Sequence, residues 1–263
     1  AERLPIIKLQ PAALLDWSGA CGASEALLAQ AYPKARRMAV EPNAAVAQQR
    51  RQARKPAWWS FMRPGGQAAS VLAPQEVEPG SVELLWSNMM LHAAIDPPAL
   101  LAQWQRALKV DGFVMFSCLG PDTARELRDV YAALGWGPPG ADFVDMHDIG
   151  DAMIHAGFAD PVMDQETLTL TWSTPEALLA ELHALGGNAS PRRFQGLRGR
   201  AWQARLMNEL RSRAQPDGRI ALRFEVAYGH AFKPLPKPRV QREATISVDE
   251  MRAMIRSSAP TTR

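Results

Sequence analysis

The sequence predicts an α/β domain built on a mostly parallel β-sheet with helices on both faces. Over the first two-thirds of the 263 residues, short apolar runs alternate with segments of helical periodicity, as they do in parallel sheets flanked by helices. Two late segments, 166–172 and 223–232, instead resemble a terminal antiparallel pair. The last strand is therefore expected to run antiparallel to its neighbours.

The expected strands of the first half are short apolar runs, and VELLWSN is nearly continuous, as in a strand buried on both faces. These strands are expected at residues 13–17, 37–41, 69–72, 82–88 and 112–118. Helices with apolar side chains at helical spacing are expected at 23–31, 43–53, 98–109 and 122–134. Asn43 is a candidate N-cap, and the Asp111-Gly112 turn is expected to end the third helix.

The character of the sequence changes after residue 134. A loop with the sequence GWGPPG precedes a helix at 146–156, which Gly157 is placed to close. The alternation in ETLTLTW predicts a half-exposed strand, and two further helices are expected at 175–185 and 197–213. The chain is thus expected to form one domain over residues 1–234, with a helical insertion at about 175–215, and a C-terminal tail at 235–263.

Composition narrows the class of protein. Apolar residues make up 47% of the chain and charged residues 22%, which is ordinary for a globular protein. No apolar run approaches the roughly 20 residues that cross a bilayer, and the first residues lack the apolar core of a secretory signal. A net charge of +3 is too mild to indicate nucleic acid. We therefore expect a cytosolic protein that binds neither membrane nor nucleic acid.

Two sequence features bear on metals and partners. Cys21 and Cys118 show no CxxC spacing, which argues against a metal site or a disulfide and favours two small buried side chains. Residues 192–213 hold seven arginines against Glu209 alone, so the basic character of the chain is local. Such a segment is either a solvated surface or a docking site for an acidic partner.

A turn with the sequence DWSGACG follows the first expected strand. A nucleotide-binding turn needs small residues so that the backbone can approach its ligand. Nineteen residues after Gly22 comes Glu41, at the end of the second strand, where a carboxylate can accept hydrogen bonds from both ribose hydroxyls. A structural turn or an NAD site would also fit, although the turn lacks full GxGxxG spacing.

Longer segments give a more specific indication. VELLWSNMMLH, MFSCLGPDTARELR, residues 143–172 and YGHAFKP resemble the malonyl-[acyl-carrier protein] O-methyltransferase family of biotin biosynthesis, with a match running from about Leu14 to Pro234. The resemblance implies the seven-stranded, Rossmann-like sheet of class I methyltransferases. It also implies S-adenosyl-L-methionine as cofactor and methyl transfer to the free carboxylate of malonyl-acyl-carrier protein.

In that family the cofactor lies across the carboxyl ends of the first, second and fourth strands. The resemblance therefore implies cofactor contacts from the glycine turn, from the carboxylate after the second strand and from the end of the fourth strand. These residues are Asp16, Ser18, Gly19, Ala20, Gly22, Glu41, Ser87 and Asn88.

The sequence departs from the family pattern at three positions. Ser18 and Ala20 stand where the family's DxGxGxG loop has glycines, and a Cβ at a positive φ costs roughly 1 kcal/mol or more. Val71 replaces the aspartate that contacts the adenine, and the sequence begins after the family's N-terminal helical segment. A second hypothesis therefore stays open: a methyltransferase-like protein that has lost catalysis and serves as a binding or assembly factor. Filling of the cofactor corner by Trp17 and Met89 would favour it.

Methyl transfer to a carboxylate makes few chemical demands, because the carboxylate is already a nucleophile at pH 7 and positioning supplies the rate. The site needs a cation or donor that holds the carboxylate, and His92 and His147 are the candidates, with a structural role as the alternative for each. Asp122 and Thr123 are candidate pocket residues, although Asp122 is equally a candidate helix N-cap. The arginines expected to dock the acidic carrier protein near the substrate entrance are Arg192, Arg193, Arg198 and Arg200. A third hypothesis keeps the fold but changes the methyl acceptor.

Overall fold

The computed structural model describes residues 3–19, 24–53, 70–186, 188 and 190–236. A seven-stranded sheet runs through it in the order β3-β2-β1-β4-β5-β7-β6. Its strands are β1 (Ala13–Trp17), β2 (Arg36–Val40), β3 (Ser70–Leu72), β4 (Val82–Asn88), β5 (Leu108–Leu119), β6 (Ala159–Trp172) and β7 (Ile220–Phe232). The pairings among β1 to β5 are parallel, whereas β7 runs antiparallel to both β5 and β6, which confirms the predicted fold class.

Seven α-helices connect these strands in the described part of the chain. They are α1 (Ser24–Ala31), α2 (Ala44–Ala53), α3 (Pro97–Ala107), α4 (Arg125–Ala133), α5 (Met146–His155), α6 (Pro175–Ala184) and α7 (Arg200–Ser212). At the N-termini of several of these helices, a side chain accepts a hydrogen bond from a backbone N–H of the first turn. The Oδ1 of Asn43 accepts the backbone N–H of Ala45 at 2.9 Å, so the predicted cap of α2 is confirmed. None of the described helices is long and apolar enough to cross a membrane.

The two faces of the sheet have separate apolar cores. On one face, α3 and α5 pack around fully buried Trp104 and Met153, together with Leu85 of β4. On the other face, Leu28 of α1 packs on Leu14 of β1 within a smaller cluster. The helices before and after β4 thus cover opposite faces, as expected of right-handed crossovers between parallel strands.

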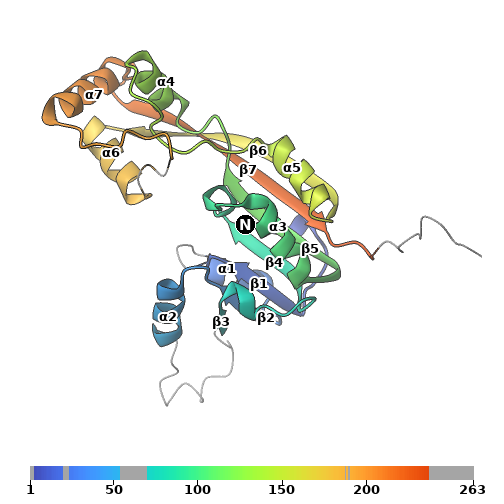
Figure 1. The fold of residues 1–263 in the computed structure, drawn as a ribbon. Coiled ribbons are helices and arrows are strands. Elements are labelled where there is room, and N and C mark those ends of the chain that lie inside the picture. Colours follow the sequence, from blue (N-terminus) through green and yellow to red (C-terminus); the bar gives the residue numbers. More distant parts are fainter. Residues whose placement is uncertain (1–2, 20–23, 54–69, 187, 189, 237–263) are drawn as a thin grey trace, which may run out of the picture.

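A third core lies outside the body of the sheet. Pairing of β5 with β7 ends at Leu119 and Val226, whereas β6 and β7 continue together as far as Trp172 and Ile220. Figure 1 shows α4, α6 and α7 gathered at the far end of this two-stranded ribbon, away from α1 and α2. We call this unit the helical lobe; its buried residues are Leu127, Val130, Trp172, Leu178, Leu206, Leu210, Ile220 and Leu222.

The expected end of the third helix is wrong. Helix α3 stops at Ala107, and β5 begins at once with Leu108. Asp111 and Gly112 therefore lie inside a strand. Asp111 has a φ of 63° and donates its N–H to the carbonyl of Lys233 at 2.9 Å, in a region where the β4–β5 register shifts. The dipeptide that predicts a turn thus forms an irregular part of β5, which the hydrogen bond to Lys233, the residue after β7, stabilises.

Four other elements begin at residues that differ from the expected ones. The helix expected from residue 122 begins at Arg125, after Ala124 in a left-handed conformation with a φ of 55°. The helix expected from residue 197 begins at Arg200, and both late strands start earlier than expected, at Ala159 and Ile220. The predicted antiparallel pairing of these two strands is confirmed.

The division into domains stays a prediction. Helices α6 and α7 do lie between β6 and β7, where the insertion is expected, and residues 237–263 of the expected tail lie outside the described residues. Cys118 is fully buried, and burial raises the pKa of its thiol to about 12, with the charge of Glu225 contributing. Its predicted role as a small buried side chain is confirmed. Cys21 lies outside the described residues.

Candidate cofactor and acceptor site

The candidate site lies at the carboxyl ends of the parallel strands. β1 pairs with β2 on one side and with β4 on the other, so these three strands end at one edge of the sheet. Asp16 pairs in register with Ala39 and with Trp86, and Glu41 directly follows β2. The expected cofactor residues of three separate segments therefore meet at this edge, which is the usual ligand position in open α/β sheets.

The turn after β1 has the backbone strain that its sequence implies. Ser18 has a φ of 61°, a conformation that favours glycine, and its N–H donates to the carbonyl of Val40 at 2.7 Å. A Cβ built on Gly19 would lie 2.0 Å from an Oδ atom of Asp16, so a side chain there would require the Asp16 carboxylate to move. Asp16 is 5% exposed beneath this turn. Ala20 and Gly22 lie outside the described residues.

Glu41 is a buried carboxylate at the end of β2. It is 4% exposed, its backbone N–H donates to the carbonyl of Leu72 at 3.0 Å, and its side chain pairs with Arg50 of α2. The next strand contributes no acid, because Val71 of β3 is a buried apolar residue. The predicted departure at this position therefore leaves only backbone groups and an apolar surface from β3.

The Trp17 side chain packs into the core of the protein and does not fill the strand-end edge. Trp17 is 2% exposed and packs in the core against Trp104, with ring centroids 6.3 Å apart and an edge-on geometry. Met89 is half-buried, has a φ of 55° and donates its N–H to the carbonyl and hydroxyl oxygens of Ser117, at 2.9 and 3.1 Å. Trp17 therefore does not provide the filling that would favour loss of catalysis.

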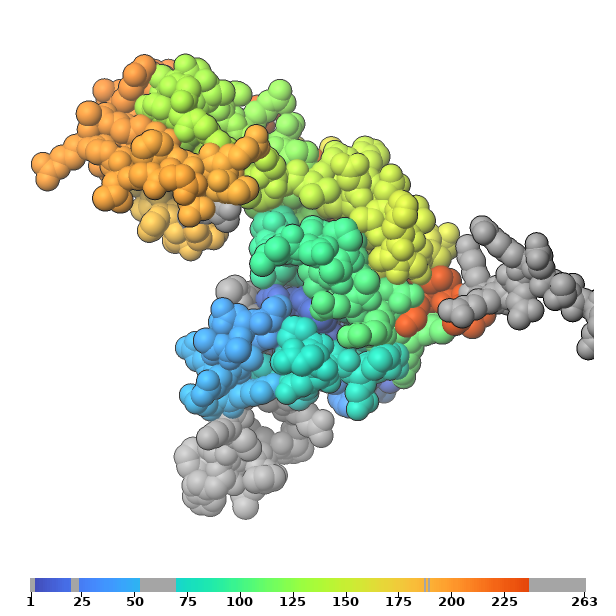
Figure 2. All heavy atoms as spheres, viewed as in Figure 1, coloured from blue at the N-terminus to red at the C-terminus, as the bar shows by residue number. Residues whose placement is uncertain are grey.

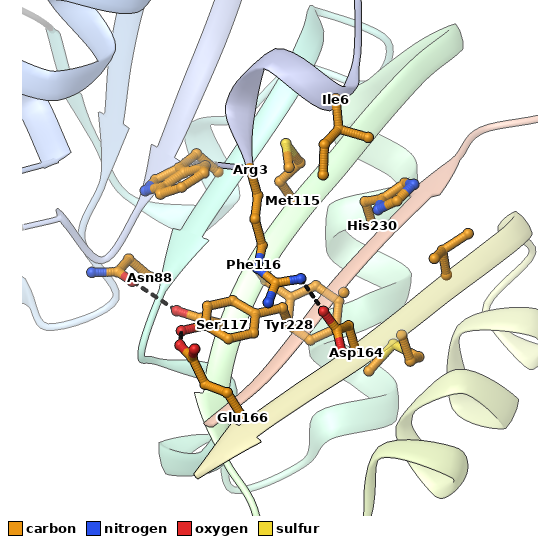
Figure 3. A pocket seen from close by; sticks show the side chains of 14 residues that line it. Arg3, Ile6, Asn88, Met115, Phe116, Ser117, Asp164, Glu166, Tyr228 and His230 are labelled. Carbon is orange, nitrogen blue, oxygen red and sulfur yellow. Dashed lines mark hydrogen bonds and ion pairs between the residues drawn. The ribbon is translucent and has the colours of Figure 1, made fainter. Parts of the chain in front are cut away.

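The two expected residues at the end of β4 have different surroundings. Ser87 is fully buried, and its hydroxyl has no hydrogen-bond partner among the described residues. Asn88 is exposed, and its Oδ1 accepts the hydroxyl of Ser117 at 2.7 Å. Because this bond fixes the amide oxygen, the Asn88 amide nitrogen points away from Ser117 (Figure 3). Asn88 rather than Ser87 thus presents donors at the edge.

The two candidate histidines are far from equivalent. Nδ1 of His92 accepts the backbone N–H of Leu119 at 3.2 Å, and its ring meets that of Phe143 edge-on at 5.5 Å. Burial lowers the pKa of His92, so its imidazole is neutral at pH 7 and carries its proton on Nε2. His147 is 79% exposed and bonds to Asp145, the N-cap of α5. His92 therefore offers a donor but no cation.

Asp122 and Thr123 do not have their expected surroundings. The N-cap of α4 is Ala124, so the interpretation of Asp122 as the helix cap is wrong. The Asp122 N–H donates to the carboxylate of Glu225 at 2.7 Å, and the buried Thr123 hydroxyl donates to the Glu225 carbonyl at 3.1 Å. Glu225 of β7 thus binds both residues of this turn, and their role as pocket residues stays a prediction.

The arginine-rich segment divides into structural and exposed members. Arg198 lies over the rings of Phe194 and Trp202 at 4.5 and 4.8 Å and donates to the carbonyl of Trp136 at 2.7 Å. Arg192 pairs with Asp142. Three other arginines of the segment are exposed and form no ion pair within the described part of the chain: Arg193, Arg200 and Arg205.

A cavity of about 660 Å³ adjoins the strand-end edge (Figure 3). Its floor is the β4-β5-β7-β6 part of the sheet, and the N-terminal segment with Arg3 and Ile6 forms one wall. Arg3 pairs with Asp164 and lies 4.1 Å above the ring of Tyr228, whose hydroxyl donates to Glu166. Burial, together with the hydrogen bond to Glu166 and the charge of that residue, raises the pKa of Tyr228 to about 12, so the phenol stays protonated at neutral pH.

Sequence reasoning missed this polar cluster. The alternation of residues 166–172 indicates a strand, but the face on which Glu166 lies depends on pairing with a strand about 60 residues later. Tyr228 and Asp164 become neighbours only through that pairing. The motif YGHAFKP supplied a family signal at Tyr228 but no chemical role.

Comparison with known proteins agrees with this geometry. A family model described as a methyltransferase domain matches residues 17–116. The malonyl-[acyl-carrier protein] O-methyltransferase of Gallionella capsiferriformans is 40% identical over 240 residues, which cover 90% of this chain and 82% of the relative. The protein of the same name from Laribacter hongkongensis is 37% identical over 244 residues, with 91% and 82% covered.

Solved structures share the fold at low sequence identity. The YcgJ protein of Bacillus subtilis has a TM-score of 0.54 and 10% identity, covering 85% of this chain and 92% of its own. A putative methyltransferase of Bacillus halodurans C-125 has the same TM-score and 13% identity, covering 85% and 93%. The sheet order, the strand-end site and the similarity over nine-tenths of the chain lead to one assignment: the chain belongs to the malonyl-[acyl-carrier protein] O-methyltransferase family of S-adenosylmethionine-dependent methyltransferases.

Proposed function

We propose that this chain transfers the methyl group of S-adenosylmethionine to the free carboxylate of a malonyl group that acyl-carrier protein carries as a thioester. The observation that carries the proposal is the pair of buried carboxylates, Asp16 and Glu41, at adjoining strand ends of a chain 40% identical to an enzyme of that name. Asp16 lies in β1 beneath the Ser18–Gly19 turn and Glu41 directly follows β2, which is where ligands bind in open α/β sheets.

The residues present fit the cofactor. Gly19 leaves bare backbone over the Asp16 carboxylate, and Glu41 supplies an acceptor for ribose hydroxyls. We assign the ribose to Glu41, the adenosyl approach to the Ser18–Gly19 turn and the methionine part to the Asp16 and Asn88 ends. When bound, S-adenosylmethionine supplies a methyl group whose departing sulfur takes the bonding electron pair, so transfer to a carboxylate needs no proton shift.

The role of the chain is therefore to orient the carboxylate and exclude water. Asn88 presents amide donors at the border of the edge, and His92 adds a neutral imidazole held by the N–H of Leu119. Donors of this kind hold a carboxylate without neutralising its nucleophilic oxygen. His147 is too exposed and too closely bound to Asp145 to share this role directly.

The helical lobe provides a surface for the acidic carrier. Arg193, Arg200 and Arg205 are exposed, and Phe194 is 53% exposed beside them. Figure 2 shows a hollow between the lobe and the part of the body that carries α1 and α2, so the lobe overhangs the strand-end edge. A carrier bound to these arginines is steered by opposite charge and has its thioester arm directed toward that hollow. The cytosolic location expected from the sequence stays a prediction.

Methyl transfer from labelled S-adenosylmethionine tests the proposal. Malonyl-acyl-carrier protein should become labelled in a form that mild base removes as methanol, and acetyl-acyl-carrier protein, which lacks the free carboxylate, should not. Binding of S-adenosylhomocysteine without any transfer would instead support a binding or assembly role. Transfer to another small acid but not to malonyl thioesters would support a different acceptor.

A further inference from the structure

The 660 Å³ cavity beside the strand-end edge has the properties of a ligand site. Its volume lies within the roughly 300–1,000 Å³ typical of small-molecule pockets, and its walls are largely apolar, including Trp86, Met115 and Val162. Polar groups occur at two places: Asn88 with Ser117 at one end, and the Arg3–Asp164 and Tyr228–Glu166 pairs across the strands (Figure 3). An amphipathic ligand with separated polar groups fits this distribution.

Asn88 lies at the border between this cavity and the cofactor edge. It ends β4, whose neighbour on one side is β1 with Asp16 and on the other side is β5 with Ser117. The cavity extends from Asn88 across β5 and β7 to β6, away from β1 and β2. A methyl acceptor with its reactive end at Asn88 would therefore extend its remaining atoms into the cavity.

The charge of the lining decides which end of the acceptor lies where. Asp164 and Glu166 are acidic, Arg3 is the only arginine or lysine of the described lining, and burial lowers the pKa of His230 so that it is neutral at pH 7. The two carboxylates outnumber the guanidinium, so a second anion is repelled from the β6–β7 side. A malonyl carboxylate belongs at the Asn88 end, and an uncharged hydrogen-bonding group belongs at Tyr228 and Glu166.

The spacing agrees with the length of a thioester arm. Neighbouring strands lie about 4.8 Å apart, so two steps from β4 to β7 span about 10 Å. With bonds of about 1.5 Å, the first amide of an acylated aminoethanethiol arm lies roughly 9 Å from the malonyl carboxylate. The carboxylate of Glu166 can accept the N–H of such an amide while it keeps the hydrogen bond from the phenol of Tyr228, which holds the carboxylate in place.

We propose that this cavity binds the amide-bearing arm of the malonyl thioester, with the acyl carboxylate at Asn88 and the first amide of the arm at Tyr228 and Glu166. The proposal rests on the proposed function and extends it from the acyl group to the arm. Tyr228 and Glu166 are positioning residues here, because neither lies at the strand end where the methyl group is transferred.

Two short substrates separate the arm from the acyl group. Malonyl-N-acetylcysteamine has the first amide, whereas S-ethyl malonyl thioester lacks it. Tyr228→Phe and Glu166→Gln should each raise the KM for malonyl-N-acetylcysteamine about two- to tenfold, the loss expected for one hydrogen bond, and leave the KM for the S-ethyl thioester unchanged. Tyr131→Phe and Glu78→Gln make the same chemical changes outside the cavity and should alter neither KM.

A binding measurement keeps this test independent of turnover. The ligand is the reaction product, the methyl ester of malonyl-N-acetylcysteamine. It is titrated calorimetrically into the protein saturated with S-adenosylhomocysteine. The two cavity variants should bind it about two- to tenfold more weakly than the parent protein, and their affinity for S-adenosylhomocysteine should stay the same. Equal losses with both thioesters, or equal affinity for the amide ligand in parent and variants, would overturn the assignment of the arm. Absence of methyl transfer from the parent protein would overturn the proposed function instead.

Discussion

The polar groups at the ends of β1 and β2 have different surroundings from those on β5, β7 and β6. At the ends of β1 and β2, buried acids already have close neighbours in the chain: Gly19 packs on Asp16, and Glu41 pairs with Arg50. Across β5, β7 and β6, the polar groups instead line an open cavity of about 660 Å³. Under the proposed function, the fixed groups of the first half would contact the cofactor, and the open cavity of the second half would leave room for a longer acceptor. Preorganised groups cost little to order on binding.

The helical lobe sharpens this comparison, because it has a core of its own. Leu206 of α7 is 1% exposed in this core, and Figure 1 shows α7 at the end of the β6–β7 ribbon, away from α1 and α2. Leu206→Ala should destabilise the lobe by about 2–5 kcal/mol, the usual range for a buried leucine. Hydrogen exchange should accelerate in α6, α7 and the end of the β6–β7 ribbon, while affinity for S-adenosylhomocysteine stays unchanged. Loss of that affinity would show that the lobe and the edge form one unit.

Removal of the ribose acceptor should give the next largest effect. Glu41→Ala should weaken binding of S-adenosylhomocysteine roughly ten- to hundredfold, because each hydrogen bond to a charged acceptor contributes about 1.5–3 kcal/mol. Glu76→Ala, which removes an exposed ion pair with Arg51 after β3, is the matched control. Calorimetric titration measures both variants. An unchanged affinity in Glu41→Ala would remove Glu41 from the cofactor site.

The free energy of unfolding should depend on pH through two histidines, His92 and His230. Burial lowers the pKa of His92 and of His230, so the unfolded chain binds more protons than the folded chain as the pH falls below about 6.5. Stability should therefore be intact above that pH and decline below it. His92→Gln should flatten the slope of unfolding free energy between about pH 6.5 and 5 in denaturant titrations. The same slope in parent and variant would contradict a neutral, buried His92.

The smallest effect is expected at the strained turn. Ser18 has a φ of 61°, so replacement by glycine removes a backbone strain of about 1–2 kcal/mol from the folded state. Glycine also raises the conformational entropy of the unfolded chain, which lowers the stability of the folded state by about 0.5–1 kcal/mol. Ser18→Gly should therefore stabilise the protein by about 0.5 kcal/mol and bind S-adenosylhomocysteine at least as well as the parent. Thermal unfolding with and without ligand measures both. A destabilised variant would show that the Ser18 side chain has a contact that offsets its strain.

Local patterns predicted the body of the fold, and long-range pairing decided where they failed. The strands at 13–17 and 82–88 and the cap at Asn43 depend on adjacent residues, and their predictions are confirmed. The Asp111-Gly112 dipeptide predicts a turn, yet Asp111 lies within a strand and donates its N–H to the carbonyl of Lys233. Asp122 reads as a helix cap, yet Glu225 binds its N–H from about 100 residues away.

The site was predictable to the same degree. Asp16 and Glu41 occur at strand ends that the sequence marks, so their shared edge could be predicted. Glu166 and Tyr228 meet only because β6 and β7 pair in one register out of several that alternation allows. Their hydrogen bond, and with it the cavity wall, is a property of the register rather than of either segment.

Hydrogen exchange with one ligand at a time tests most directly whether the sheet divides into a cofactor half and an acceptor half. S-adenosylhomocysteine should protect the ends of β1 and β2, including the Ser18–Gly19 turn and Glu41. The methyl ester of malonyl-N-acetylcysteamine, added afterwards, should protect the cavity-lining parts of β6 and β7 around Glu166 and Tyr228. Protection of the same segments by both ligands, or none at β1 and β2 with S-adenosylhomocysteine, would contradict this division of the sheet.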